Sequence, residues 1–175
     1  MKCSNCGREV EEGYSFCKYC GAELSGIVVN PQDKVESSSE TSAESEVTNT
    51  IIRRFDGIKN RDENVIKVLI DESYNKFDDW PPYTRQEDDE ALKNEFSAFK
   101  VLSNYDYKLK DLKVDVVGGI AIATFSISYQ GIIRGRRFDI ASRVTSVLRK
   151  QGTEWKIVHE HFSRFPDDAR RRFFS

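Results

Sequence analysis

The chain has no long hydrophobic run and no hydrophobic start. None of its 175 residues falls in an apolar stretch near the roughly 18 residues that cross a bilayer. The first residues, MKCSNCGREV, also lack the apolar segment of a secretory signal peptide. Neither charge sign dominates, because 27 Lys and Arg stand against 29 Asp and Glu, so no global basic field points to nucleic acid or to an anionic membrane. These absences predict a soluble, cytoplasmic protein.

Cysteine is absent after residue 20. The four cysteines of the chain form two Cys-x-x-Cys pairs. Ten residues separate the pairs, a spacing that lets four thiolates converge on one zinc ion: Cys3, Cys6, Cys17 and Cys20. A glycine follows each pair and lets the chain turn tightly around the metal. Two disulfides would need an oxidising compartment, and a redox dithiol should open a helix in a βαβ unit that this segment is too short to form. We therefore expect one structural Zn²⁺ whose closed thiolate shell leaves no position for catalysis.

The cysteine-rich segment resembles a known class of small module. Two CxxCG knuckles, with Gly-x-x-Phe before the third cysteine in "GYSFCKYCG", are similar to the N-terminal zinc ribbons of many prokaryotic proteins. The resemblance covers residues 1–24 and implies a binding or spacing module that contacts a protein partner. Within this range three basic residues face four acidic ones, a balance that argues against nucleic acid: Lys2, Arg8 and Lys18 against Glu9, Glu11, Glu12 and Glu23.

Residues 25–47 contain no aromatic side chain and are rich in Ser and Glu. Such a composition buries too little apolar area to offset the entropy of ordering the chain. We expect a flexible, mildly acidic linker.

From about residue 48 the apolar residues recur at helical spacing. Three stretches predict helices around residues 51–58, 62–70 and 84–102, with an extended piece between the second and third. Asp62 is placed to cap the second helix, and Thr84 with Glu87 forms a capping box for the third.

Farther on, the apolar period changes to two. Four strands are predicted around residues 105–117, 120–133, 136–150 and 153–165, separated by turns at Gly118, Gly135 and Gly152. Helices followed by an antiparallel meander indicate an α+β domain over residues 48–175, with helices on one face of the sheet.

The last two strands resemble a known family. The segment "RVTSVLRKQGTEWKIVHEHFSRFP" is similar to the closing hairpin of SnoaL-like domains in the nuclear transport factor 2-like superfamily, and to the association domain of calcium/calmodulin-dependent kinases. "IKNRDENVIKVLIDESY" resembles the family's first two helices. The resemblance covers residues 48–166. It implies a cone-shaped fold in which three helices pack into a strongly curved sheet around a pocket, with dimerisation through the outer sheet face.

Candidate pocket residues follow from strand alternation. Trp155, Ile157, His159 and His161 share one face of the last strand if no bulge intervenes, and Arg143 lies on the strand before. In the cone, His161 with His159 could perform acid/base chemistry beside a carboxylate from Asp56, Asp78 or Asp79, and Arg143 could hold an anion. Alternatively, both histidines lie on a sheet surface that a dimer partner buries.

Two histidines two residues apart also allow a metal site, but no third ligand is evident. The chain end, "DDARRRFFS", is consistent with either a partner contact or a frayed charged tail.

Together these patterns favour a zinc-binding, non-catalytic protein. A SnoaL-like domain would bind a small ligand or form a homodimer, and would display two tethered zinc ribbons to a protein partner. The alternative is an isomerase, cyclase or dehydratase that uses His161 and a pocket carboxylate. A third possibility, binding of nucleic acid or polymerase through the ribbon, predicts salt-sensitive binding by residues 1–24.

Overall fold

The computed structural model describes residues 2, 9 and 31–166. The four cysteines expected to bind zinc lie outside these residues. The chain divides into two compact units, residues 1–39 and 40–175. The description below concerns the second unit and the helix that leads into it.

The first helix starts well before the predicted domain boundary. α1 spans Pro31–Asn60, so the linker expected over residues 25–47 overlaps a helix for most of its length. Val47 is fully buried and Ala43 packs against the core, each four residues from the next apolar position of α1. Proline suits the first turn of a helix, and packing of an apolar stripe stabilises a helix that composition alone disfavours.

Two short helices and two strands complete the helical side of the domain. α2 (Glu63–Leu69) is capped by Asp62, whose carboxylate accepts the backbone N–H groups of Asn64 and Val65, as predicted. β1 (Ile70–Phe77) and β2 (Arg85–Glu87) precede α3 (Asp88–Phe99). The capping box predicted at Thr84 is wrong. β2 continues to Glu87, so the helix starts later, and no side chain caps it.

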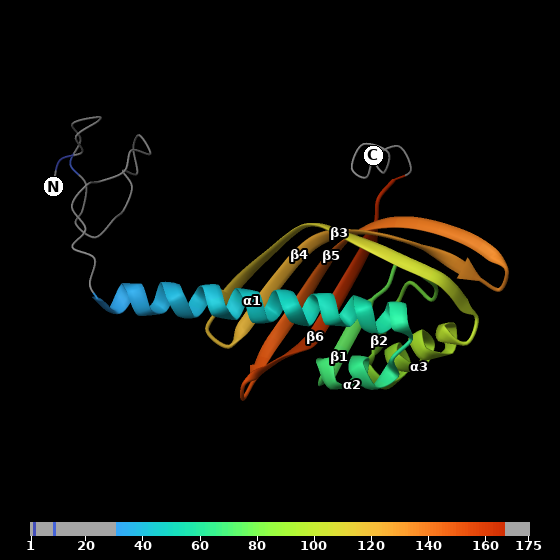
Figure 1. Cartoon of the computed structure of the whole chain (residues 1–175), viewed down its shortest axis with the longest axis horizontal. Helices are drawn as coiled ribbons and strands as arrows, with labels where there is room; N and C mark the ends of the chain where they lie inside the picture. Colours follow the sequence, from blue (N-terminus) through green and yellow to red (C-terminus); the bar gives the residue numbers. More distant parts are fainter. Residues whose placement is uncertain (1, 3–8, 10–30, 167–175) are drawn as a thin grey trace. The chain divides into compact units, whose positions relative to one another are not determined.

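The sheet has six strands in the order β2-β1-β6-β5-β4-β3. β3 (Leu102–Val117), β4 (Ile120–Ile133), β5 (Arg136–Gln151) and β6 (Glu154–Arg164) form the predicted antiparallel meander, with turns at the predicted glycines. β1 runs parallel to β6 and joins the meander to the helical side. Figure 1 shows the long strands curving, with all three helices on the same side of the sheet.

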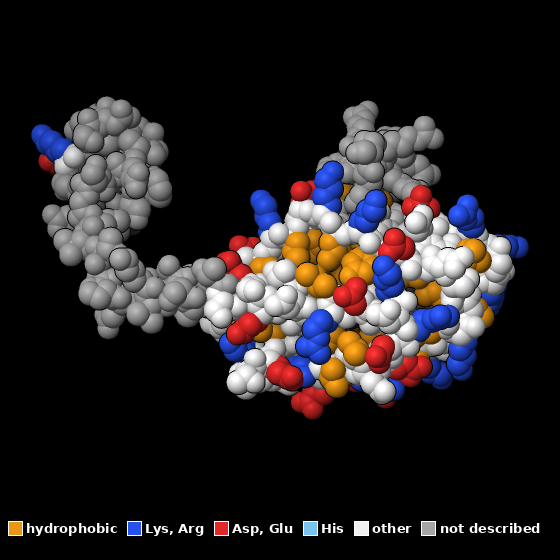
Figure 2. Space-filling view, viewed as in Figure 1, with side chains coloured by type: hydrophobic (Ala, Val, Ile, Leu, Met, Phe, Trp, Pro, Cys, Tyr) orange, Lys and Arg blue, Asp and Glu red, His pale blue; other side chains and the backbone are white. Residues whose placement is uncertain are grey.

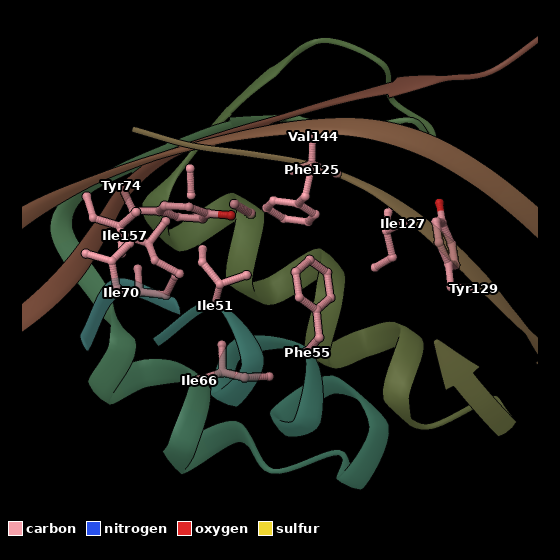
Figure 3. Close-up of a cluster of buried hydrophobic side chains, with 14 of the residues drawn as sticks. Ile51, Phe55, Ile66, Ile70, Tyr74, Phe125, Ile127, Tyr129, Val144 and Ile157 are labelled. Atoms are coloured by element: carbon pink, nitrogen blue, oxygen red, sulfur yellow. The ribbon is translucent and has the colours of Figure 1, made fainter. Parts of the chain in front are cut away.

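The core lies between the helices and the concave side of this sheet. Ile51 and Phe55 of α1 and Ile66 of α2 point toward Phe125 and Ile157 of the strands (Figure 3). Phe55 meets Phe125 edge-on, with 5.6 Å between ring centroids. Of the apolar positions whose spacing predicted the first helix, Ile51 and Phe55 are buried, whereas Ile52 is exposed.

Charge is mixed over the visible surface. Figure 2 shows acidic and basic side chains interspersed with hydrophobic ones on the face that carries α1. This matches the net charge of −2. Within the residues that the structure describes, no helix is both long and apolar enough to cross a membrane.

Candidate functional site

A bulge in β6 decides which side chains face the concave side of the sheet. Leu148 of β5 pairs with Ile157, but the next residue, Val147, pairs with His159, so Val158 is inserted. A one-residue insertion moves every later side chain to the opposite face. Glu160 is therefore fully buried and His161 is exposed.

The predicted pocket residues do not line the cavity described below. His159 and His161 lie on the outer face, where both rings contact Phe77 of β1. Arg143 is exposed on β5, where it bonds Ser163. Trp155 lies before the bulge and packs in the core, with its Nε1 donating to Glu46 at 3.1 Å. The interpretation that placed these residues together in the cone is corrected, because it assumed an unbroken strand.

The cavity is lined mainly by aromatic and aliphatic side chains. It holds about 390 Å³, within the range of small-molecule sites. α1 contributes Phe55 and Ile58, α3 contributes Phe99, and the strands contribute Ile127 and Phe138. One part of the wall is polar, with eight residues that carry charge or amide groups: Arg54, Lys76, Asp78, Asp79, Gln86, Asn94, Glu95 and Arg134.

Arg54 is the centre of a buried ion-pair network beside the cavity. Its guanidinium forms a bidentate pair with Glu95 at 2.6 and 2.7 Å and also reaches Glu160 at 3.2 Å. Tyr74 donates to the same Glu160 oxygen at 2.6 Å. Lys76 bridges Asp78 at 2.8 Å and Glu95 at 3.3 Å. Each carboxylate of this network thus has a cationic partner.

The charges of this network outweigh the cost of burial for Glu95. Burial opposes ionisation, but the positive charges of Arg54 and Lys76 hold the pKa of Glu95 at about 2. The second oxygen of Glu160, Oε1, is buried without a hydrogen bond, as is the hydroxyl of Ser146 directly opposite on β5. Apart from this pair of atoms the network is closed, and it ties α1, α3, β1 and β6 together.

Asp79 has a different environment, although it lines the same cavity. It lies in the loop after β1 and is 6% exposed. Tyr129 donates to its Oδ1 at 2.6 Å and receives a bond from Trp80 Nε1 at 3.1 Å, while the hydroxyl of Ser142 donates to its Oδ2. Burial raises the pKa of Asp79, and the neighbouring Asp78 adds to this effect against the two hydroxyl hydrogen bonds.

The sequence analysis named two of the cavity residues and missed the rest. Asp78 and Asp79 were among its carboxylate candidates, and both line the cavity. The third, Asp56, is exposed on α1 and accepts a bond from Tyr107. A signal for the others exists, because Arg54 and Glu95 occupy positions within the apolar stripes of their helices. A charged residue at such a position indicates a buried pair.

No group of three or more metal-binding side chains occurs within the part of the chain that the structure describes. The zinc ligands predicted in residues 3–20 are outside that part, so zinc remains a prediction.

Solved structures share this fold at low sequence identity. An NTF2-like superfamily protein from Salmonella enterica is 22% identical, with a TM-score of 0.65 over 73% of this chain and 94% of that one. The association domain of CaMKII from Caenorhabditis elegans is 20% identical, with a TM-score of 0.60 over 72% and 98%. A Streptomyces avermitilis protein, named as a candidate dehydratase of the NTF2-like family, is 15% identical with a TM-score of 0.65 over 72% and 98%. At these identities the likeness concerns the fold.

Family models assign both parts of the sequence. A domain of unknown function, DUF7575, matches residues 1–25. A search of curated protein sequences found no match. The model of the SnoaL-like domain matches residues 78–168, just over half of the chain. That match includes the loop with Asp79, the strands that enclose the cavity and the β6 bulge, and it establishes that this chain belongs to the SnoaL-like domain family.

Proposed function

We propose that this SnoaL-like domain is a non-catalytic binding module whose cavity holds a small, largely apolar molecule. The observation that carries the proposal is the cavity itself, about 390 Å³ with an aromatic and aliphatic wall. Its strongest acid and base groups, Arg54, Lys76 and Glu95, are occupied by one another. Groups held in closed ion pairs are poorly suited to transfer protons.

A cavity-filling variant tests this function. Ala98 lies on α3 in the cavity lining, so Ala98→Trp should occupy the space that a ligand needs. Small molecules extracted from the purified full chain and identified by mass spectrometry should be present in the wild type and depleted in this variant. The control is Lys93→Trp, which adds the same side chain at an exposed position of α3 outside the lining. Equal ligand content in all three proteins would contradict the proposal.

The outer sheet face is the proposed dimer interface. Ile122 of β4 is 43% exposed and pairs with Val147 of β5, and the adjacent pair is Thr124 with Thr145. These small and branched side chains lie between Lys113 and Asp115 of β3 and the two histidines of β6. The printed names of several solved structures with this fold are association or hub domains of CaMKII, which supports oligomerisation as a use of the fold.

Sedimentation equilibrium should therefore report a dimer. Val147→Asp should give monomers, because each dimer would bury two carboxylates without partners. Val68→Asp is a matched control, since Val68 is 53% exposed on α2, on the helical side. A wild-type monomer, or a Val147→Asp variant that remains dimeric, would contradict this assignment.

The N-terminal cysteines complete the proposal as a structural zinc ribbon that contacts a protein partner in the cytoplasm. Its support is the two CxxCG pairs. Metal analysis of the full chain should find close to one zinc per chain, and Cys17→Ser should lose most of it. Full zinc content in that variant would count against the ribbon.

Asp79 favours a second candidate function, acid/base catalysis by an isomerase, cyclase or dehydratase. Its carboxyl group lines the cavity, its pKa is raised by burial, and Tyr129 bonds it. A carboxyl group of this kind can exchange protons with a bound substrate. Deuterium exchange at the α-carbon of cyclic ketones, followed by NMR, would reveal such chemistry. The activity should disappear in Asp79→Asn and persist in Asp115→Asn, at an exposed position of β3.

A further inference from the structure

Asp79 is a buried carboxylate that forms no ion pair with the side chains of residues 42–166. Its two oxygens accept hydrogen bonds from two neutral hydroxyls, those of Tyr129 and Ser142. Arg164 donates to the backbone oxygen of Asp79 at 2.7 Å and lies over the same loop, with its guanidinium carbon 5.9 Å from the Trp80 ring centroid, but makes no ion pair with the carboxylate. Over residues 42–166, no Lys, Arg or His nitrogen lies within 4 Å of that carboxylate. A buried negative charge of this kind is costly unless a cation joins it.

The surrounding charges leave a surplus of acid on this wall. Asp78 and Glu95 share Lys76, and Glu95 and Glu160 share Arg54. With Asp79 the wall and its support carry four carboxylates and three side-chain cations, the third being Arg134. An anionic ligand would add to the surplus, whereas a cationic ligand would reduce it.

Aromatic rings stand beside Asp79. Phe138 lies 5.3 Å from Trp80 and 6.1 Å from Tyr129, measured between ring centroids, and Tyr105 lies 6.2 Å from Tyr129. All four residues line the cavity. Ring faces attract ammonium groups, and the attraction is greater where water is excluded.

We infer that the cavity takes a ligand with an apolar body and an amine or other organic cation, and that the cation lies at Asp79 among Trp80, Tyr129 and Phe138. The inference rests on the proposed function, since it assumes that the cavity is a ligand site. The cation supplies the charge that Asp79 lacks, and the apolar body occupies the aliphatic part of the wall.

Binding of a cation would also be linked to protons. The groups that face the Asp79 carboxyl are Asp78 and Trp80 in its own loop, Tyr129 from β4 and Ser142 from β5, with Arg164 of β6 at its backbone. A cation favours the ionised carboxylate, so a protonated Asp79 must release its proton on binding. Affinity for a cation should fall up to tenfold per pH unit below the pKa of Asp79, while affinity for a neutral ligand should not.

Three probes of one shape test the inference on the full-length protein: 3-phenylpropylamine, 3-phenylpropanol and 3-phenylpropanoate. Calorimetric titration at neutral pH should give the amine at least tenfold higher affinity than the alcohol and no measurable binding of the acid. Asp79→Asn should remove the preference for the amine and leave the alcohol's affinity within about threefold. Asp115→Asn on the outer face should change neither affinity.

The outcomes separate the two proposals. If the alcohol binds as tightly as the amine, the cavity remains a ligand site and the cation inference is overturned. If none of the probes binds, both are overturned. Should Asp79→Asn fail to fold, the wild-type pH profile decides, because a preference for the amine that does not decline with falling pH would overturn the inference.

Discussion

Two groups of carboxylates beside one cavity are stabilised in different ways. Glu95 and Glu160 are joined to Arg54, and burial of their charges is offset by ion pairs. Asp79 is also buried, but among the described side chains its hydrogen-bond donors are two neutral hydroxyls. The pKa of Glu95 is accordingly lowered and that of Asp79 is raised. The first group therefore stabilises the fold, whereas the second retains a charge that the fold does not neutralise.

Replacing Arg54 should cause the largest loss in the free energy of unfolding. Arg54→Met would leave Glu95 and Glu160 with one fewer cation in the interior. Breaking a buried pair from one side typically costs about 3–5 kcal/mol, and we expect that loss in the free energy of unfolding measured with urea. Arg53→Met is the matched control at the next, exposed position of α1 and should change stability by less than about 0.5 kcal/mol. A loss below about 1 kcal/mol for Arg54→Met would show that the network contributes little.

Lowering the pH should affect stability differently through the two groups of carboxylates. The pKa of Glu95 is lowered from 4.5 to about 2, so its contribution is present above pH 4.5 and is lost as the pH falls toward 2. A shift of this size corresponds to about 3 kcal/mol. Glu95→Gln should lower stability at neutral pH and flatten the acid limb of the pH-stability curve. An acid limb with unchanged slope would contradict the assignment.

Asp79→Asn should act in the opposite direction and more weakly. A raised pKa means that the folded protein binds a proton more tightly, so stability decreases as the pH rises through the pKa of the folded state. Removing the charge should leave stability at pH 7 unchanged or raise it by about 1 kcal/mol, because the amide keeps one of the hydroxyl bonds. The gain should vanish below about pH 3.8, where the carboxyl group is protonated in both states. A loss of more than about 2 kcal/mol at pH 7 would instead make Asp79 a structural group.

The four-stranded meander and the second helix could be predicted from the sequence because turns and helical stripes leave local signals. Gly118, Gly135 and Gly152 have positive φ and mark the three hairpin turns, and Asp62 caps α2 as predicted. Which side chains line the cavity depends on the bulge in β6, and this bulge leaves no such local signal in the sequence. The bulge at Val158 inserts one ordinary residue into a strand and exchanges its two faces, so Glu160 replaces His161 on the concave side.

The buried charges were missed for a related reason. Arg54 and Glu95 are 41 residues apart in sequence, and only the tertiary structure brings their side chains together. The length of α1 also came from tertiary contacts, since Val47 is buried against the sheet in a segment whose composition favours a linker. Local patterns predict which residues are helical more readily than which distant residues meet.

Variants of the outer-face histidines should have the smallest effects. They test whether ligand binding in the cavity depends on the outer face of the sheet. Burial lowers the pKa of His159, and repulsion from His161 lowers it further. The folded state therefore favours the neutral form of His159. The resulting stabilisation is present above pH 6.5 and is lost as the pH falls below that value. His159→Gln should remove this part of the pH dependence, as thermal unfolding between pH 7 and pH 5 would show. His161→Ala should leave 3-phenylpropylamine affinity within twofold of the wild type, because the bulge places this residue outside the cavity. A tenfold loss of affinity in His161→Ala would mean that the outer face contributes to ligand binding, and the separation of the two faces would have to be abandoned.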